Sequence, residues 1–387
     1  MAKLGEVCTI VSGSTPKTSV TSYWDGNIKW ITPAELNEDT FYIMDSVRHI
    51  TEEGKEKTGL SYLPTGTDIL SSRAPIGKTA IAGCEMCCNQ GFKNLICSDA
   101  IYNEYLYFFL KSKTDYLNSL GRGATFKEIS KSIVESIEIP LPEVNQQKEI
   151  AEKFKKLEQL ISLRKQQLAK LDELVKARFV EMFGDPADNV NNLPASPMTA
   201  ICQIIDGDRG KNYPKQEEFS DSGFCLFLNA KNVTAQGFSF ENCTYITEEK
   251  DALLRNGKLC RGDVVLTTRG TIGNLAFYDT SVPYENIRIN SGMVILRMNK
   301  QVVSEIFFIE QFKMQLDSIK SRIASGSAQP QLPISTMNKI EMILPPIELQ
   351  NQFAAFVERV SQQKQTVQQS LEKLELMKKA LMQEYIG

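Results

Sequence analysis

The chain has 387 residues, a length that favours two domains over one. Apolar residues make up 42% of it and charged residues 24%, and no stretch approaches the ~18 apolar residues that a membrane span needs, so we predict a soluble protein without a membrane partner. The net charge of −3 excludes a surface coated throughout with phosphate-binding cations, although it leaves room for local basic loops.

The first globular segment is predicted to span residues 1–142. Within it, residues 68–72 and 78–82 have the composition of two strands, so Arg73 between them is expected near the tip of a hairpin. Apolar side chains at helical spacing predict a helix over 103–120. The segment therefore combines helix with sheet.

A long helix follows, predicted for residues 143–185. Its inward positions alternate four and three residues apart from Ile150 to Met182, the period of a left-handed coiled coil. Gly184 and Pro186 stop the helix, because glycine can adopt the left-handed cap conformation and proline cannot continue the helical hydrogen bonding. At 1.5 Å per residue, about 40 residues give a helix of about 60 Å.

The rest of the chain repeats this organisation. The helical stretch 147–184 matches 350–387 at a constant offset of 203 residues, and the hairpin 69–77 matches 265–273. The fold class is therefore predicted as α+β, with two similar mixed domains, each followed by a long helix. The two helices are expected to pack as an antiparallel coiled coil in a pseudo-twofold molecule, which suits it to reading two sites about 34 Å or more apart on DNA. The predicted parts are a first domain at 1–142, a first helix at 143–185, a second domain at 186–345 and a second helix at 346–387.

Four cationic residues interrupt the apolar heptad positions of these helices: Arg164, Arg178, Lys364 and Lys378. Their long aliphatic stems could leave the seam and carry the charge to solvent. Alternatively, polar groups within the seam fix the antiparallel register. The sequence leaves both explanations open.

Catalytic and metal-binding patterns are incomplete. The sole histidine, His49, lacks the pattern of a catalytic triad around it. Residues 75–79 resemble the tail of a phosphate-binding loop, but Ser72 stands where that loop needs glycine. Cys84, Cys87 and Cys88 lack a second ligand pair for zinc, and nine cysteines in total indicate reduced thiols. We therefore predict a non-catalytic chain without its own metal or cofactor. Since no apolar leader follows Met1, a cytoplasmic location is expected.

Polar loops recur at matching places in the two globular segments. Arginine can bind guanine through two hydrogen bonds, asparagine and glutamine can bind adenine, and hydroxyl groups can hold phosphates without adding charge. One such loop alone is typical of a solvated turn, but their repetition favours nucleic-acid binding. The candidate DNA-binding residues are Lys17, Arg73, Gln90, Lys93, Arg122, Thr125 and Lys127 in the first segment, and Arg209, Lys211, Arg269, Asn290, Arg322, Ser327 and Gln329 in the second.

An ordered series of motifs runs through the chain: Gly13-Ser-Thr-Pro16, Tyr23-Trp24, Trp30-Ile31, Asp68 to Gly77, Cys88 to Phe92, Ile139-Pro-Leu-Pro142 and Leu344 to Gln350. In this order they resemble the specificity (S) subunit of type I restriction–modification enzymes over the full chain. The resemblance implies two target recognition domains, each reading one half of a bipartite, asymmetric double-stranded DNA sequence. It also implies that the helices set the gap between the two halves.

The resemblance further implies partners that carry the chemistry. Two modification subunits would use S-adenosylmethionine to methylate adenine, and restriction subunits would hydrolyse ATP with Mg²⁺ and cleave DNA. The second copy departs from the family pattern, with Gly207 to Tyr213 in place of the Gly-Ser-Thr-Pro loop and Asn290-Ser-Gly in place of Asn-Gln-Gly. This divergence fits different half-sites.

Two alternatives stay open. In the first, the same kind of recognition chain serves a partner in which nuclease and methylase are fused. In the second, the chain is a coiled-coil scaffold whose globular segments bind proteins and not DNA. Co-purified partners distinguish the first alternative, and salt-dependent DNA binding distinguishes the second.

Overall fold

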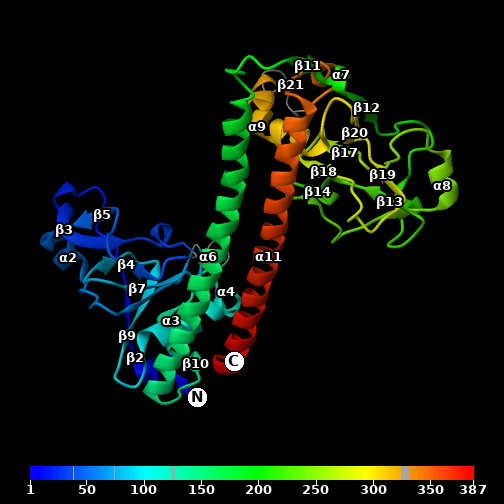
Figure 1. Cartoon of the computed structure of the whole chain (residues 1–387). Coiled ribbons are helices and arrows are strands. Elements are labelled where there is room, and N and C mark those ends of the chain that lie inside the picture. The colour runs from blue at the N-terminus through cyan, green and yellow to red at the C-terminus, as the bar shows by residue number, and fades with distance from the viewer. Residues whose placement is uncertain (38, 74, 124–126, 324–330) are drawn as a thin grey trace. The chain divides into compact units, whose positions relative to one another are not determined.

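The computed structural model describes residues 1–37, 39–73, 75–123, 127–323 and 331–387, without the side chains of 322 and 323. Contacts divide the chain into two units, residues 1–166 with 368–387 and residues 167–367. Each unit holds one globular domain and one end of each long helix, α6 (Val144–Phe183) and α11 (Ile347–Tyr385) (Figure 1). The predicted mixture of helix and sheet is confirmed.

The domain of the first unit is built on a five-stranded sheet of order β2-β9-β6-β7-β4 and a three-stranded sheet of order β5-β3-β8. Its strands are β1 (Ala2–Lys3), β2 (Cys8–Ser12), β3 (Trp24–Ile31), β4 (Tyr42–Ile43), β5 (Arg48–Ile50), β6 (Asp68–Ser71), β7 (Thr79–Ala82), β8 (Cys87–Cys88), β9 (Phe92–Cys97) and β10 (Glu138–Ile139). Its helices are α1 (Leu4–Val7), α2 (Glu52–Thr58), α3 (Asn103–Ser112), α4 (Thr114–Leu120) and α5 (Lys131–Glu135).

The five-stranded sheet is buried on both faces. Successive side chains of a strand point to opposite faces, so Leu70 of β6 packs with Tyr105 of α3 while Ile69 packs with Ile31 and Leu63 in a second core. The apolar, non-alternating sequence of β6 and β7 follows from this double burial. The predicted hairpin around Arg73 is confirmed, since β6 and β7 pair antiparallel.

The helix predicted over 103–120 is two helices, separated at Lys113 (φ −99°, ψ 14°). The hydroxyl groups of Ser112 and Thr114 donate to the carbonyl oxygens of Phe109 and Lys111 at 2.7 and 3.0 Å. Such bonds compete with helical hydrogen bonds and bend the chain, which the spacing of apolar residues cannot reveal.

The domain of the second unit has a four-stranded sheet of order β12-β20-β17-β18 and a three-stranded sheet of order β16-β13-β19. Its strands are β11 (Ala195–Pro197), β12 (Cys202–Asp206), β13 (Cys225–Leu228), β14 (Val233–Thr234), β15 (Gly237–Phe238), β16 (Tyr245–Ile246), β17 (Val264–Thr267), β18 (Leu275–Phe277), β19 (Ile287–Ile289), β20 (Met293–Met298) and β21 (Glu341–Ile343). Its helices are α7 (Met198–Ile201), α8 (Glu248–Leu253), α9 (Glu305–Ile323) and α10 (Ile334–Met337).

Both domains are closed in the same way. The first and last strands of each domain pair with one another, β1 with β10 and β11 with β21. A fully buried glutamine near the start of each long helix makes equivalent bonds. Gln147 accepts from the Tyr102 N–H and donates to the Pro142 carbonyl, at 2.8 Å each. Gln350 does the same with Ser304 and Pro345 at 3.0 and 2.8 Å, so the sequence repeat is also a repeat of structure.

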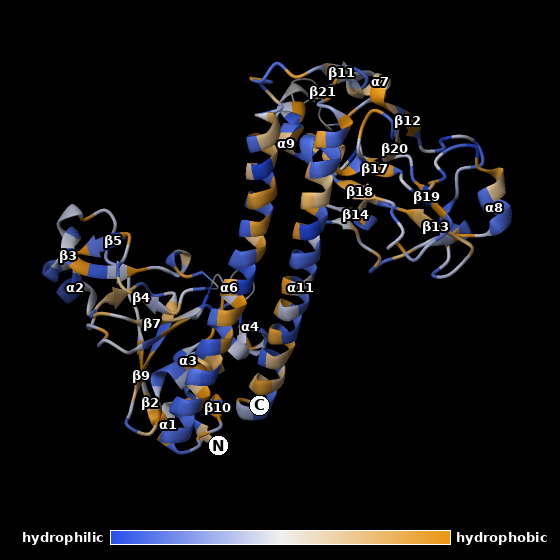
Figure 2. Ribbon diagram, in the orientation of Figure 1, coloured by the Kyte–Doolittle hydropathy of each residue, from blue (hydrophilic) through white to orange (hydrophobic). Residues whose placement is uncertain are grey.

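The two long helices pair antiparallel within each unit. In the first unit Lys378 of α11 lies 2.7 Å from Glu158 of α6, and in the second Lys364 lies beside Asp172. Phe154 and Val367 are buried at heptad positions while most other helical positions are exposed, and Figure 2 shows hydrophilic and hydrophobic residues alternating along both helices. The heptad prediction is confirmed, and α6 ends at Phe183, followed by Gly184 with φ 80°, the left-handed conformation predicted for it.

Among the described residues, no helix is both long enough and apolar enough to cross a lipid bilayer.

Candidate nucleic-acid interface

Strand register gathers the polar loops of the first domain at one edge of its larger sheet. Ser12, at the end of β2, lies opposite Lys93 at the start of β9. Ser71, at the end of β6, lies opposite Phe92 of the same strand. The loops that follow β2 and β6 and the loop that precedes β9 therefore leave the sheet side by side.

Backbone hydrogen bonds join these loops. The N–H of Ser72 donates to the Gly91 carbonyl at 2.7 Å, and the N–H of Ser14 donates to the Cys88 carbonyl at 3.1 Å. The N–H of Ile129 donates to the Ser72 carbonyl at 3.0 Å and so adds a fourth segment. We call this group the first loop cluster; its described residues are 13–17, 72–73, 75–78, 89–91, 122–123 and 127–129.

The second domain builds the same arrangement. Asp206 of β12 lies opposite Val294 of β20, and Thr267 of β17 lies opposite Met293. The N–H of Thr268 donates to the Gly292 carbonyl at 2.9 Å, as Ser72 does to Gly91. The second loop cluster comprises, among the described residues, 207–213, 268–274, 290–292 and 331–332.

Two glycines explain how closely these loops approach one another. A Cβ atom on Gly13 would lie 2.0 Å from the Asn89 carbonyl oxygen, and one on Gly207 would lie 2.3 Å from that of Asn290. Both distances are far below van der Waals contact, so only glycine fits at these equivalent positions. The asparagine side chains complete the turns, because Asn89 and Asn290 accept from the N–H groups of Gly91 and Gly292 at 2.6 and 2.9 Å.

Most candidate residues of the first domain lie in its loop cluster. Lys17, Arg122 and Lys127 are exposed, and Arg73 and Gln90 are half-buried. The Gln90 Oε1 atom is enclosed without a hydrogen-bond partner among the residues that the structure describes. Thr125 lies outside the described residues.

Lys93 differs from the other candidates. Its side chain is only 8% exposed, and its ammonium group lies 3.2 Å from Glu128 and 3.4 Å from the Ser72 hydroxyl. The Lys93 ammonium therefore points toward Glu128 and Ser72, within the loop cluster, and away from solvent. We therefore assign Lys93 to the support of the loops and leave it out of the proposed DNA contacts.

The candidates of the second domain also divide into two kinds. Lys211 and Arg269 are exposed, and the exposed Arg209 is held 3.1 Å from Asp206 and 3.3 Å from the Ser291 carbonyl. Asn290 shapes its turn through its side-chain oxygen, as described above. Arg322 lies in the last turn of α9 and its side chain is not described. Ser327 and Gln329 lie outside the described part of the chain.

Two tryptophans donate hydrogen bonds to backbone carbonyls of the first loop cluster. The indole N–H of Trp24 donates to the Lys17 carbonyl at 3.2 Å, and that of Trp30 donates to the Ser14 carbonyl at 3.0 Å. The Arg48 guanidinium lies 3.5 Å from the centre of the Trp24 ring. In the sequence these tryptophans stood out only as family motifs, because nothing local shows which carbonyls the indoles reach.

Other motifs have structural roles. The Lys78 ammonium donates to the carbonyls of Pro33 and Leu36 at 3.3 and 2.6 Å, so it is engaged within the protein. Cys87 and Cys88 are neighbours on β8 and enter two different cores, where burial raises their pKa values to about 11 and about 12. In the described ranges, no group of three or more histidine, cysteine or acidic side chains could hold a metal ion.

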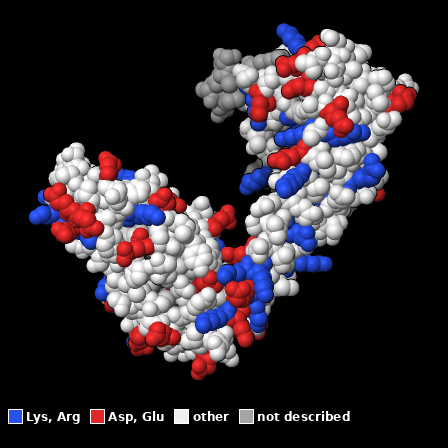
Figure 3. Space-filling model, turned by 60° about the vertical axis from the view of Figure 1, so that its left-hand side comes forward, with Lys and Arg blue, Asp and Glu red and all other residues white. Residues whose placement is uncertain are grey.

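Charge is mixed over the molecular surface. On the face drawn in Figure 3, lysines and arginines are interspersed with aspartates and glutamates. Together with a net charge of −3, this argues that any polyanion is bound through local loops and not through a broad basic surface.

Comparison with known proteins identifies relatives of the whole chain. The family model described as the type I restriction modification DNA specificity domain matches residues 1–173 and again residues 198–376. The type I restriction enzyme MjaIX specificity subunit of Methanocaldococcus jannaschii is 29% identical over 389 residues, covering 92% of this chain and 85% of that protein. The MjaVIII specificity subunit of the same organism is 25% identical over 311 residues, covering 75% and 70%.

Two solved structures share the fold. The S subunit of a type I restriction–modification system from M. genitalium has a TM-score of 0.58 and 17% identity, over 100% of this chain and 95% of that one. A chain from a structure described as the basis of complex assembly and conformational transition of the type I R-M system has a TM-score of 0.61 and 16% identity, over 99% and 96%. The fold likeness thus extends over both copies.

Proposed function

The chain belongs to the family of type I restriction–modification specificity subunits, and from this premise we propose that each of its two loop clusters reads one half of a bipartite DNA sequence. The single observation that carries the proposal is the repeat of the cluster. The same four segments occur once in each copy of the DNA specificity domain, and two backbone bonds recur: the bond from Ser72 to Gly91 as that from Thr268 to Gly292, and the bond from Ile129 to Ser72 as that from Leu332 to Thr268. DNA recognition is the role of that domain, and two clusters provide for two half-sites.

We assign base reading first to Arg73 and Arg269, which occupy equivalent positions after β6 and β17. A guanidinium group can donate two hydrogen bonds to guanine in the major groove. The exposed cations Lys17, Arg122, Lys127, Arg209 and Lys211 would then contact phosphates and fix the register of each domain on the duplex. Because the two clusters differ in sequence, the two half-sites should differ, which makes the target asymmetric.

Catalysis is assigned to partner subunits. We propose that two modification subunits bind this chain and methylate adenine with S-adenosylmethionine, and that restriction subunits use ATP and Mg²⁺. The long helices α6 and α11 would set the distance between half-sites, since their 40 and 39 residues join the two domains. Such a complex acts on the cell's own DNA, which places the chain in the cytoplasm.

Mapping methylated adenines across the genome, with and without this chain, tests the proposal. We expect methylation to disappear at one bipartite sequence when the chain is removed and to return when it is restored. An unchanged methylation map would contradict a role in DNA recognition. Co-purification from the same cells identifies whether nuclease and methylase arrive as separate subunits, as proposed, or as one fused chain.

A further inference from the structure

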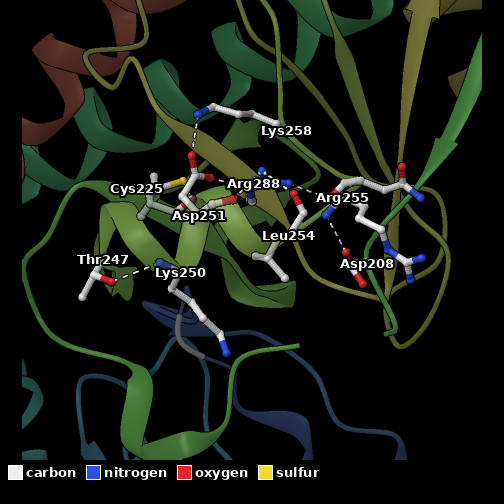
Figure 4. Close-up of polar contacts among 11 residues, drawn as sticks. Asp208, Cys225, Thr247, Lys250, Asp251, Leu254, Arg255, Lys258 and Arg288 are labelled. Atoms are coloured by element: carbon white, nitrogen blue, oxygen red, sulfur yellow. Dashed lines mark hydrogen bonds and ion pairs between the residues drawn. The ribbon is translucent and has the colours of Figure 1, made fainter. Parts of the chain in front are cut away.

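We propose that Arg255 is a further DNA-contacting residue of the second domain, and that the buried ion pair between Arg288 and Asp251 is the device that positions it (Figure 4). The inference rests on the proposed function and deepens it. Arg255 lies outside the predicted loops, on the segment between α8 and β17.

Arg288 forms a buried ionic centre. Its side chain is 6% exposed, and its Nε–H donates to the Asp251 carboxylate, which is equally buried. The Lys258 ammonium contacts the second oxygen of the same carboxylate. Burial raises the pKa of Asp251, but the bonds from Lys258 and Arg288 outweigh it and the pKa is lowered, so Asp251 is ionised. Buried charges are costly unless their partners and geometry are good, and here they are.

The same guanidinium holds the backbone on both sides of Arg255. It donates to the Leu254 carbonyl at 3.1 Å and to the Asn256 carbonyl at 2.7 Å. The N–H of Arg255 itself donates to the Asp208 carboxylate at 2.8 Å. Charge-assisted hydrogen bonds of this kind are the strong ones, so the backbone of Arg255 is fixed while its side chain stays exposed.

Asp208 connects this segment to the second loop cluster. Its other carboxylate oxygen accepts from the Gly210 N–H at 2.7 Å, and these two backbone bonds lower its pKa. A Cβ atom on Gly210 would lie 2.8 Å from the Arg255 guanidinium, which therefore rests against the loop that carries Arg209 and Lys211. Asp206 pairs with Arg209 and Asp208 holds the backbone of Arg255, while the guanidinium of Arg255 and the ammonium of Lys211 stay exposed beside this loop, where they can contact DNA phosphates or bases.

In the first domain, the position that corresponds to Arg288 is occupied by Cys87, which cannot form such an ion pair. β8 and β19 both run parallel to the central strand of their sheet, with Cys87 opposite Trp30 and Arg288 opposite Phe227. Cys87 packs in an apolar core with Trp24, Trp30 and Leu60. The ion pair thus belongs to one domain only, as expected for a feature that serves one half-site.

The test compares Arg255→Ala with the wild-type chain in the complex with its modification partner. Competition binding would use DNA duplexes that carry the methylated sequence, with substitutions in either half-site. We expect Arg255→Ala to weaken binding about 10- to 100-fold. A loss confined to certain bases of one half-site indicates base contact, and a uniform loss with a shallower salt dependence indicates phosphate contact. Both results support the assignment, and binding equal to wild type overturns it.

Lys300→Ala provides the matched control. Lys300 is an exposed cation of the same domain, paired with Glu305 at 2.9 Å. It follows the far end of β20, whose six residues span about 20 Å away from the loop cluster at roughly 3.3 Å per residue. We expect this variant to bind DNA as the wild type does. If the wild-type complex shows no sequence preference, the proposed function is wrong. If the wild-type complex shows a preference and Arg255→Ala binds DNA as the wild type does, only the role of Arg255 is wrong.

The positioning role of Arg288 is tested with Arg288→Met and the double variant Arg288→Met/Arg255→Ala. If Arg288 acts through Arg255, the double variant binds DNA with the same affinity as whichever single variant has the lower affinity. Independent losses that multiply would overturn the positioning role. Because Arg288→Met could fail to fold, Asp208→Asn is the second variant: it spares the ion pair, and we expect the same selective loss as for Arg255→Ala, with unchanged binding overturning the role of the Asp208 contact.

Discussion

At the scale of single residues, Arg73 and Arg269 show how one position serves two domains. Each follows a buried strand and pairs through its backbone with the far segment of its cluster, Arg73 with Glu128 and Arg269 with Gln331. The position is therefore fixed by the fold while the surrounding side chains differ. This arrangement allows half-site preference to change without a change of scaffold.

For Arg73→Ala we expect a loss of about 1–3 kcal/mol in binding, restricted to one base position of one half-site, because one guanidinium contact with a base is removed. Binding of the assembled complex to systematically substituted duplexes measures this loss. Lys3→Ala is the control, since Lys3 is exposed and precedes β2 at the end remote from the loops. An equal loss in both variants would remove Arg73 from the site.

Asp68 is a second residue with a testable consequence. It is fully buried; burial, followed by the neighbouring Cys97, raises its pKa well above the usual range, and its Oδ1 atom has no hydrogen-bond partner among described residues. The folded state therefore holds a proton that the unfolded state releases above about pH 4. The contribution of Asp68 to the free energy of unfolding is greatest below that pH and falls as pH rises toward the folded pKa.

Asp68→Asn should abolish this dependence. We expect the variant to be more stable than wild type at pH 7 by on the order of 1–3 kcal/mol, because the wild type must take up a proton on folding at a cost of about 1.4 kcal/mol per pKa unit, with the difference vanishing near pH 4. Urea unfolding at several pH values measures it. A difference that grows as pH falls would contradict the assignment. The equivalent position of the second domain, Val264, already lacks a charge.

At the scale of elements, the loop clusters depend on close backbone approach. Gly13→Ala places a methyl group within 2.0 Å of the Asn89 carbonyl oxygen, so the two loops must separate. We expect a destabilisation of about 1–3 kcal/mol and weaker discrimination in one half-site only. Thermal unfolding and half-site competition measure the two effects.

Gly5→Ala is the matched control for Gly13→Ala. Its nearest neighbours are the Cβ and Cγ atoms of Glu135 at 3.0 and 3.2 Å and the Glu135 carbonyl oxygen at 3.2 Å, so the added methyl group needs a much smaller displacement than the 2.0 Å contact at Gly13 does. A smaller loss of stability and unchanged DNA binding are expected. Equal effects of the two substitutions on DNA binding would show that Gly13 matters for general folding and not for the cluster.

The cationic heptad positions give another prediction. Glu158 is 23% exposed and lies between Lys378 and Lys111 at 2.7 and 3.1 Å; burial raises its pKa, but these lysines outweigh that effect and lower it. Its stabilising effect is present above the unfolded pKa and is lost as pH falls through the folded pKa. Lys364 and Asp172 are more exposed, at 36% and 59%.

Lys378→Leu should therefore lower the free energy of unfolding by about 1 kcal/mol at pH 7, and the loss should shrink as Glu158 is protonated. Lys364→Leu should change it by less, because solvent screens that pair. Denaturant unfolding at pH 7 and pH 3 compares the two variants. If Lys364→Leu leaves the spacing of half-sites unchanged as well, its charge does not set the helical register.

Sequence alone could predict the elements that local patterns determine. The heptad spacing located both long helices, and strand composition located the hairpin of Arg73. The break at Lys113 depends on hydroxyl bonds, and the role proposed for Arg255 depends on the bonds that Arg288, 33 positions later in the chain, makes to the backbone on either side of it. Lys93 looked like its neighbours in sequence, yet its contact with Glu128 turns it inward. Long-range contacts decide these cases.

At the scale of the whole molecule, the chain is a duplication in which each copy closes on itself. The pairs β1–β10 and β11–β21, with Gln147 and Gln350, tie the ends of each domain to a long helix. A self-contained domain can vary its loops without disturbing the other copy. We therefore expect the two half-sites to be read independently.

Adenine methylation maps of cells that carry Arg73→Ala or Arg269→Ala test this independence most directly. We predict that each variant still yields a bipartite sequence at the wild-type spacing, with relaxed base preference in one half for Arg73→Ala and in the opposite half for Arg269→Ala. Relaxation of the same half by both variants would contradict the assignment of one half-site to each domain.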